Sequence, residues 1–206
     1  MNIDMLSLSA HIFLGPKGVG ACYCRRGIPL NNLIDGGAQE RGNRAGTENV
    51  AGIVGLATAL RIADSELAQT APRLTAMRDR LIDGILQSVP MCRLNGSRTN
   101  RLPGNCNISC LGLEGESLLL RLDLAGIAAS SGSACASSSL DPSHVLLAIG
   151  LPHEVAPGSV RLSLSDLNTE EDVDYILEKL PQIVSTLRQM SPLWEQIQKG
   201  EVSFEL

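Results

Sequence analysis

Cys135 stands in the middle of a segment, residues 128–144, that consists almost entirely of small and polar side chains. Small side chains and Gly132 leave the backbone free and the thiol accessible. A cysteine nucleophile needs that access, because the reactive species is an exposed thiolate. An exposed free cysteine without a function is an oxidation liability. The pattern therefore favours a reactive cysteine over an incidental one in a surface loop.

Four further residues carry side chains that suit an anionic ligand. Ser9 and His11 have i, i+2 spacing on the polar face of an expected strand that begins at Met5, so they can contact one group together. Thr47 precedes an expected helix, where a hydroxyl suits an anion and equally suits a plain N-cap. Arg161 lies among apolar residues of an expected strand. A lone buried guanidinium is costly, so its partner is a ligand carboxylate or a structural ion pair.

The six cysteines include two close pairs, Cys22 with Cys24 and Cys106 with Cys110. Each pair places its sulfurs on one face of an expected strand. Neither pair has the C-x₂-C spacing of a zinc knuckle, so buried small hydrophobic side chains are preferred over a metal site. We expect no metal to be bound by the protein alone.

The composition indicates a folded chain without a nucleic-acid partner. Hydrophobic residues make up 44% of the 206 residues and charged residues 19%, which supplies a core, and the net charge of −5 gives no basic surface for nucleic acid. No apolar run is long enough to cross a bilayer, and the N-terminus lacks the pattern of a signal peptide. We expect a cytoplasmic protein with reduced thiols and no membrane partner.

The candidate residues need elements to position them, and apolar periodicity predicts these. A helix is expected from Val50 and a second one after Pro72, with residues 63–72 between them as a hinge. Beyond Pro90, strands and helices alternate, which predicts a compact α/β unit. Strands are expected at 92–94, 106–110, 127–129 and 160–164, and helices at 116–124 and 143–149 and from a capping box at Thr169 onward.

Six stretches of the chain, in order, resemble the NifS/IscS-type cysteine desulfurases of the class V aminotransferase family. They cover most of the chain outside residues 62–100 and the C-terminal tail. They are SAH…GPKGVGA at 9–21, GGAQERGNRAGTENVAGIVGLA at 36–57, RLPGNCNIS at 101–109, EGESLLLRLDLAGIAAS at 114–130, SSGSACASSSLDPSHVL at 130–146 and VRLSLSDLNTEEDVDY at 160–175.

The resemblance implies an α/β fold, the C-terminal half of a pyridoxal 5'-phosphate (PLP) enzyme of fold type I. Residues 1–64 then form the end of the large PLP-binding domain and its sheet. Residues 65–190 form the small α/β domain, and residues 191–206 a loosely held tail.

The resemblance also implies a function and a set of site residues. Such a homodimeric enzyme takes sulfur from L-cysteine, or selenium from selenocysteine, and leaves alanine and a persulfide on Cys135. Ser9 and His11 contact the cofactor phosphate, Thr47 reaches the phosphate of the neighbouring subunit, and Arg161 pairs with the substrate carboxylate. The sulfur passes to an acceptor or to an iron–sulfur scaffold protein, where Cys135 can be a transient iron–sulfur ligand.

Two departures from the family pattern bear on activity. Ile12 occupies the position of the PLP lysine, and isoleucine can neither form a Schiff base nor move a proton. Lys17 does not replace it, because the family has its own lysine at that place as well. The family also places a whole half of the enzyme before the strand that carries Ser9. We therefore expect PLP to be non-covalent or absent, residues up to Asn49 to need a partner, and this chain alone to be inactive.

Three readings of the function remain open from the sequence. The first is a desulfurase completed by an N-terminal half from another chain. The second is a non-catalytic homologue that keeps the Cys135 segment as a sulfur relay or scaffold-docking surface. The third is a truncated, inactive copy. Loss of the lysine at Ile12 favours the second and third, and retention of Cys135 and Arg161 favours the first two.

Overall fold

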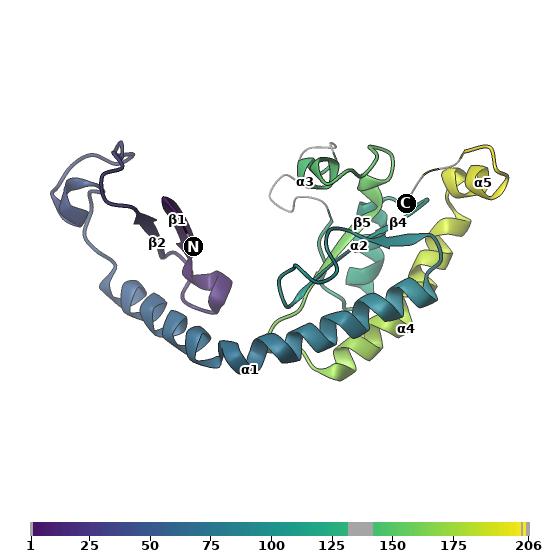
Figure 1. Ribbon diagram of the computed structural model, residues 1–206, viewed down its shortest axis with the longest axis horizontal. Coiled ribbons are helices and arrows are strands. Elements are labelled where there is room, and N and C mark those ends of the chain that lie inside the picture. The colour runs from purple at the N-terminus through teal and green to yellow at the C-terminus, as the bar shows by residue number, and fades with distance from the viewer. Residues whose placement is uncertain (1, 132–141, 203, 205–206) are drawn as a thin grey trace. The chain divides into compact units, whose positions relative to one another are not determined.

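The computed structural model describes the chain except for residues 1, 132–141, 203 and 205–206 (Figure 1). The chain forms two compact units, residues 1–69 and 70–206. Helix α1 (Val50–Ser88) contributes its first turns to the first unit and its remainder to the second. Among the helices of the described residues, none is long and apolar enough to cross a membrane.

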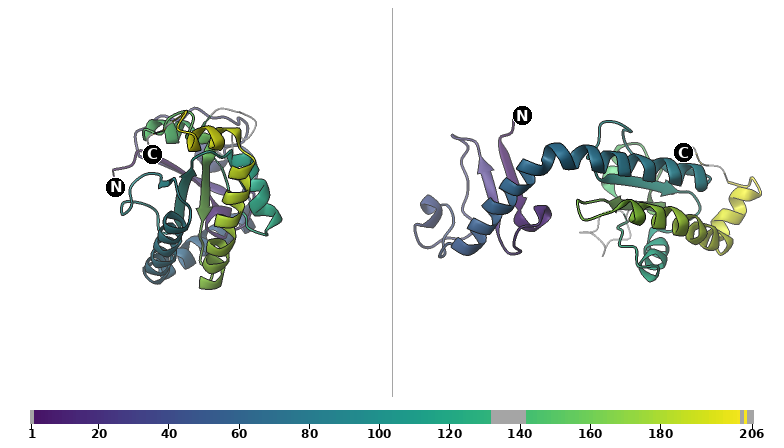
Figure 2. Two further views of the ribbon diagram at one scale, coloured as in Figure 1. Left: turned by 90° about the vertical axis from the view of Figure 1, so that its right-hand side faces the viewer. Right: turned by 90° about the horizontal axis from the view of Figure 1, so that it is seen from below.

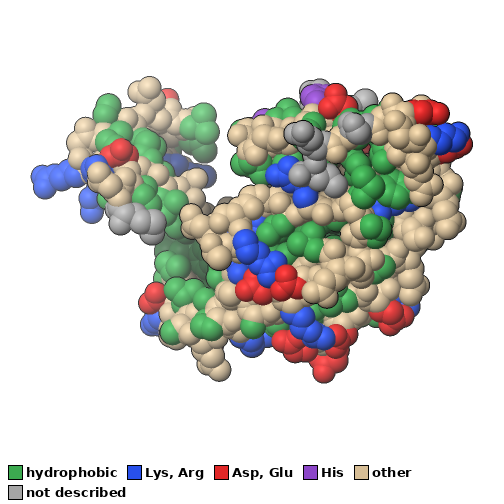
Figure 3. Space-filling model, turned by 45° about the vertical axis from the view of Figure 1, so that its right-hand side comes forward, with side chains coloured by type: hydrophobic (Ala, Val, Ile, Leu, Met, Phe, Trp, Pro, Cys, Tyr) green, Lys and Arg blue, Asp and Glu red, His purple; other side chains and the backbone are tan. Residues whose placement is uncertain are grey.

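The first unit contains a two-stranded antiparallel hairpin. Strand β1 (Met5–Ser9) pairs with β2 (Gly20–Cys24), with Ser9 opposite Gly20. The unit also contains two 3₁₀ turns. The first, η1 (Ala10–Phe13), lies between the two strands, and the second, η2 (Gln39–Gly42), lies in the long glycine-rich loop after β2. Hydrophobic side chains of β1, β2 and the first turns of α1 remain on the surface of this unit, as Figure 3 shows.

Helix α1 is continuous, so the predicted break between two helices at residues 63–72 is wrong. The boundary between the two compact units nevertheless falls inside this segment, after residue 69. The segment contains alanine, glutamate, leucine and glutamine, which are all strong helix formers. Pro72 lies inside the helix, and its missing N–H removes one backbone hydrogen bond without ending the helix. Asp64, Ser65 and Pro72 lie near the two ends of the segment and gave a misleading turn signal, because the helix formers between them continue the helix.

The second unit is built on a three-stranded antiparallel sheet. Strands β3 (Cys92–Leu94), β4 (Asn105–Cys110) and β5 (Ser159–Ser163) lie in the order β3-β4-β5. The C-terminal part of α1, α2 (Gly115–Leu124) and α4 (Glu170–Gln189) pack around this sheet (Figures 1 and 2). The α/β architecture predicted for this region is confirmed.

The core of the second unit uses aliphatic side chains and cysteine in place of aromatics. Every helix that covers the sheet contributes to it, with Leu81, Ile82 and Ile85 from α1, Leu118 and Leu122 from α2, and Val173, Ile176, Leu180 and Val184 from α4. Helices α1 and α4 lie side by side (Figure 1), where Gly84 admits the Leu177 side chain so closely that an added Cβ would lie 2.5 Å from it. Arg80 crosses the same contact and donates to Glu170 at 2.7 Å and to Asp174.

Residues at the N-terminus of α4 form the capping box that the sequence predicted. Thr169 is the N-cap, and its hydroxyl accepts from the Asp172 amide at 3.4 Å. The Asp172 carboxylate in turn accepts from the Thr169 amide at 3.0 Å, which completes the predicted capping box. Four apolar residues at helical spacing then point into the core, and Pro181 lies inside the helix.

Two expectations for the second unit need correction. The expected strand at 127–129 is reduced to a single bridge between Ser130 and Arg161. The tail is not loose over its first residues, since α5 (Pro192–Gln198) forms there with Ser191 as its cap. Trp194 of α5 stacks on the Arg188 guanidinium with the ring centroid 4.0 Å away, and this contact holds the tail on α4. The short helix α3 (His144–Ala148) ends near Gly150, close to its expected limits.

Candidate active site

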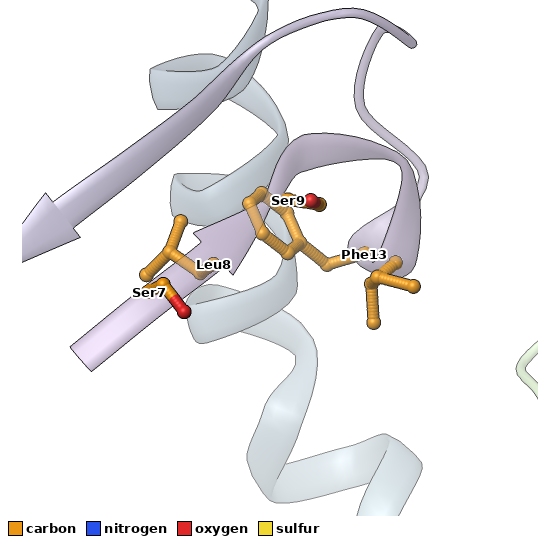
Figure 4. A pocket seen from close by; sticks show the side chains of 5 residues that line it. Ser7, Leu8, Ser9 and Phe13 are labelled. Carbon is orange, nitrogen blue, oxygen red and sulfur yellow. The ribbon is translucent and has the colours of Figure 1, made fainter. Parts of the chain in front are cut away.

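Ser9 and Ile12 line one hollow in the first unit. The hollow has a volume of about 380 Å³ and is bounded by Ser7, Leu8, Ser9, Ile12 and Phe13. Figure 4 shows Ser9 at the end of β1 beside the ring of Phe13, with Ser7 and Leu8 further back along the strand. The hydroxyls of Ser7 and Ser9 are the polar side-chain groups among these lining residues.

His11 does not lie on the strand, contrary to expectation. The chain leaves β1 after Ser9 and turns through η1, because Ala10 is fully buried and its amide donates to the Val19 carbonyl at 3.1 Å. Gly15 folds back onto Ala10, with its amide 2.8 Å from the Ala10 carbonyl. A side chain at Gly15 would lie 2.9 Å from Ala10, so this close approach requires glycine. His11 is exposed and is not among the residues that bound the hollow.

Ile12 is 75% exposed and stands at the hollow with no packing role in the unit. The residues that bound the hollow offer hydroxyl and hydrocarbon groups, and none of them carries an amine. A cofactor aldehyde therefore has no group here with which to form a covalent bond, so the described residues do not fit a lysine-linked PLP. Non-covalent contact between a phosphate and the Ser9 hydroxyl remains compatible with this surface.

Thr47 is exposed in the loop before α1, and it is not the cap of that helix. Asn49 takes this role, since its Oδ1 atom accepts from the Gly52 amide at 3.1 Å. The capping alternative for Thr47 is therefore wrong. Its hydroxyl is left to face solvent one turn before the helix N-terminus, which is a position that suits contact with an anion.

Arg161 lies on β5, at the edge where the chain returns from α2. Its amide donates to the Ser130 carbonyl at 2.6 Å, and the Ser130 amide donates to the Arg161 carbonyl at 3.0 Å. Its Nε atom is buried and has no hydrogen-bond partner among the described residues. Within that same part of the chain, Arg161 also forms no ion pair, so the structural alternative finds no support.

Cys135 lies outside the described residues. The described chain reaches Ser131, next to the bridge between Ser130 and Arg161, and Ser131 packs near Gly115 at the start of α2. The first and second units each hold part of the predicted site. Ser9 and Ile12 share a hollow in the first, whereas Arg161 and the root of the Cys135 segment are adjacent in the second.

The other cysteines of these two pairs differ in burial. Cys106 and Cys110 are buried, as predicted, and burial raises the pKa of the Cys106 thiol to about 12. Cys22 is exposed and Cys24 half-buried, so the expectation that they are core residues is wrong, because the two-stranded hairpin leaves that face of β2 open. Among the described residues, no group of histidine, cysteine, aspartate or glutamate side chains could hold a metal ion.

Sequence reasoning missed one cluster, in which Cys92 faces Cys110 across the sheet with their Sγ atoms 2.7 Å apart. Spacing along one strand could not reveal it, since the two cysteines lie 18 residues apart. The signal that could have found it is the pairing of the expected strands at 92–94 and 106–110, which places cysteines at matching ends.

The sequence profile of the family described as aminotransferase class-V matches residues 1–176. The chain belongs to the aminotransferase class-V family. This family is PLP-dependent, and its assignment confirms the resemblance drawn from the motifs.

Curated relatives of this class-V chain are named cysteine desulfurase. The cysteine desulfurase IscS of Clostridium botulinum (strain Hall) is 58% identical over 203 residues, which are 98% of this chain and 51% of that protein. The cysteine desulfurase IscS of Methanosarcina thermophila is 57% identical over 193 residues, 94% of this chain and 48% of that protein. The chain thus spans about half the length of the curated relatives it matches.

Solved structures agree with the class-V assignment. A NifS-like protein matches with a TM-score of 0.79 and 40% identity, covering 90% of this chain and 47% of that one. A NifS-like protein from Rickettsia africae ESF-5 matches with a TM-score of 0.79 and 28% identity, covering 89% and 48%. The predicted fold class, the C-terminal part of a PLP fold-type-I enzyme, is confirmed.

Proposed function

We propose that this chain supplies the C-terminal half of a cysteine desulfurase, in which sulfur from L-cysteine is transferred to Cys135. The observation that carries the proposal is the Arg161 Nε atom, which is buried and without a partner among the described residues. A buried guanidinium donor in that state is suited to a ligand carboxylate, and it lies beside the root of the Cys135 segment. The curated relatives named cysteine desulfurase support the substrate.

Each residue of the proposed site has a limited task. Arg161 binds and orients the carboxylate of L-cysteine. The paired hydrogen bonds between Ser130 and Arg161 fix the start of the Cys135 segment to the substrate-binding strand. Cys135 accepts sulfur as a thiolate nucleophile. The net change moves one sulfur atom, because L-cysteine and the Cys135 thiol become L-alanine and a Cys135 persulfide.

The cofactor contacts in this half are non-covalent. Ser9, His11 and Thr47 are proposed to contact the phosphate of PLP, which supplies an electron sink when bound. Ile12 cannot provide the covalent link, and no amine bounds the hollow at that position. The chain alone is therefore proposed to be inactive. It requires the half that precedes it in the curated relatives, in a dimer, and a sulfur-acceptor or iron–sulfur scaffold protein.

A second candidate function is a sulfur relay without desulfurase activity of its own. The exposed Ile12 side chain favours it, because loss of the amine removes catalysis while leaving the acceptor cysteine in place. In that role Cys135 receives sulfane sulfur from a persulfide donor and passes it on.

A complementation assay tests the first proposal. The chain is co-purified with the N-terminal half of a close desulfurase, with and without Ile12→Lys, and is supplied with PLP and L-cysteine. Alanine is quantified, and the persulfide is located by peptide mass spectrometry. We expect turnover only with Ile12→Lys, persulfide on Cys135, and loss of both products in Cys135→Ser. Cys22→Ser is the matched control, since Cys22 is an exposed thiol of the first unit and carries no role in the proposal.

Three outcomes of this assay decide between the functions. Turnover by the unmodified chain alone contradicts the role assigned to Ile12. Absence of turnover in the lysine variant, with a stable complex, contradicts the desulfurase proposal. The relay is tested by adding a persulfide donor to the unmodified chain. Sulfane sulfur that labels Cys135→Ser as fully as the parent chain excludes the relay.

A further inference from the structure

Cys92 and Cys110 are directly opposite each other in the antiparallel pair of β3 and β4. The Leu111 amide donates to the Met91 carbonyl at 3.0 Å, and the Asn95 amide donates to the Asn107 carbonyl at 2.9 Å. Hydrogen-bonded pairs alternate along an antiparallel ladder, so residues 91 and 95 belong to such pairs and Cys92 does not. Non-hydrogen-bonded partners have Cα atoms about 4.5 Å apart, within the range that a disulfide spans.

The two sulfurs already lie close together. Their Sγ atoms are 2.7 Å apart, which exceeds a disulfide bond of about 2.05 Å by only about 0.7 Å. Cys110 is 1% exposed on the central strand, whereas Cys92 is half-buried on β3, the outer strand of the described sheet. A reagent from solvent therefore reaches Cys92 more readily than Cys110.

A buried positive charge lies beside this pair. Arg188 of α4 is 5% exposed, and its guanidinium donates to the carbonyls of Pro90 at 2.7 Å, Leu111 at 3.0 Å and Met91 at 3.2 Å. Two of these residues directly flank Cys92 and Cys110 in sequence. Trp194 stacks on the same guanidinium.

Carbonyl groups satisfy the hydrogen bonds of Arg188 but do not neutralise its charge. Among the described residues, no carboxylate forms an ion pair with it. A buried cation in this state is stabilised by a nearby anion, and the Cys92 thiolate is the available one. The hydrogen bond between the two thiols and the charge of Arg188 hold the pKa of Cys92 below its ordinary value. The hydrogen bond to Cys92 and burial hold the pKa of Cys110 well above its ordinary value.

Two simpler roles for the cluster are less suitable. A metal ion would need further ligands, and no third histidine, cysteine or carboxylate joins the pair among the described residues. If the two thiols served only for packing, the Arg188 guanidinium, which has no counter-ion among the described residues, would not be needed beside them.

We propose that Cys92 and Cys110 form a dithiol–disulfide couple that reacts with low-molecular-weight disulfides. The Cys92 thiolate attacks one sulfur of the small disulfide, forms a mixed disulfide, and releases the other half as a thiolate that takes a proton. Cys110 then loses its proton to solvent and attacks the Cys92 sulfur, which releases the second small thiol. Two protein thiols are oxidised and one small disulfide is reduced to two thiols. The couple is separate from Cys135 and does not depend on the desulfurase proposal.

Redox titration of the full chain tests the couple without any variant. The reduced chain is equilibrated with mixtures of reduced and oxidised glutathione, quenched in acid, alkylated and digested. Mass spectrometry should find a peptide joined through Cys92 and Cys110, which lose their alkyl labels together as the mixture becomes more oxidising. Cys22 and Cys24 serve as the control pair, since they lie on one strand and should form no comparable link. Independent labelling of Cys92 and Cys110 in every mixture overturns the proposal.

Variants then assign the order of attack. Cys110→Ser should trap one glutathione on Cys92, whereas Cys92→Ser should leave Cys110 unmodified, and the reverse pattern excludes the proposed order. Arg188→Gln should slow alkylation of Cys92 at neutral pH, because loss of the positive charge removes one of the causes that lower the pKa of Cys92 and so reduces its thiolate fraction. Arg188→Lys keeps the charge and is the matched control. If the arginine variants do not fold, trapping in Cys110→Ser still decides the matter.

Discussion

The Arg161 amide lies 2.6 Å from the Ser130 carbonyl, and the reverse hydrogen bond between the same two residues is 3.0 Å long. This pair joins the strand that carries the candidate carboxylate-binding side chain to the residue five positions before Cys135. A substrate bound at Arg161 and the root of the nucleophile's segment therefore share one rigid support. The relationship makes Arg161 the residue whose replacement most directly tests the proposed site.

Replacing Arg161 by glutamine should raise the KM for L-cysteine in the complemented enzyme that carries Ile12→Lys. A hydrogen bond to a charged group contributes about 1.5–3 kcal/mol, so the increase should be at least about tenfold. Steady-state alanine formation measures it. Arg93→Gln is the matched control, because Arg93 is an equally half-buried arginine on β3 of the same sheet. Equal KM values for the two variants would show that Arg161 does not bind the substrate carboxylate.

Alanine variants of Thr47 and Asn49 should show whether Thr47 contacts the ligand or caps helix α1. Asn49→Ala removes the acceptor of the Gly52 amide and should cost about 1 kcal/mol in the first turn of α1. Hydrogen exchange at Gly52 then becomes faster. Thr47→Ala should leave that exchange unchanged and instead weaken retention of PLP by the complemented enzyme during dialysis. Faster exchange in Thr47→Ala, with PLP retention unaltered, would return Thr47 to a structural role.

The sequence predicted elements whose signals are local. Thr169 and Asp172 are three residues apart and make both bonds of the capping box, and Gly150 follows α3 with a positive φ of 89°. Such contacts need no knowledge of the remaining fold. Residues 63–72 do not break the helix, because proline inside a helix is tolerated when strong helix formers surround it. The predicted change from one unit to the other does fall within this segment.

Features that depend on long-range packing could not be read from spacing. Trp194 is ordered through Arg188, and Cys92 meets Cys110 only after β3 and β4 pair. At the candidate site, the motifs identified Ser9, Ile12, Thr47 and Arg161 by type. They could not show that His11 turns away from the strand, because that turn depends on the burial of Ala10.

Removing the cap of α4 should destabilise the second unit. Thr169→Ala loses the acceptor for the Asp172 amide and should lower the free energy of unfolding by about 1 kcal/mol. Urea unfolding followed by fluorescence of Trp194, the one tryptophan of the chain, measures this unit. Thr186→Ala is the matched control in the same helix, where the hydroxyl only bonds back to the Gln182 carbonyl. A loss as large in Thr186→Ala would show that the capping box is not the cause.

Cys106 should make the second unit less stable at alkaline pH. Burial raises the pKa of its thiol from an ordinary value of 9.0 to about 12. A group whose pKa is raised by folding contributes stability that is complete below the unfolded value and is lost as pH rises toward the folded value. The Cys106 contribution should therefore be complete near pH 7.5 and decline between about pH 9 and pH 12.

Comparison with Cys106→Ala isolates this contribution from that of the other titrating groups. The variant leaves a small cavity in the core and should be less stable than the parent chain at pH 7.5. The difference between the two chains should then narrow as pH rises above 9, because only the parent gains a thiolate on unfolding. Urea unfolding at pH 7.5 and pH 10.5, followed by Trp194 fluorescence, measures the difference at each pH. A constant difference across that range would show that the Cys106 thiol ionises as freely in the folded chain as in the unfolded one.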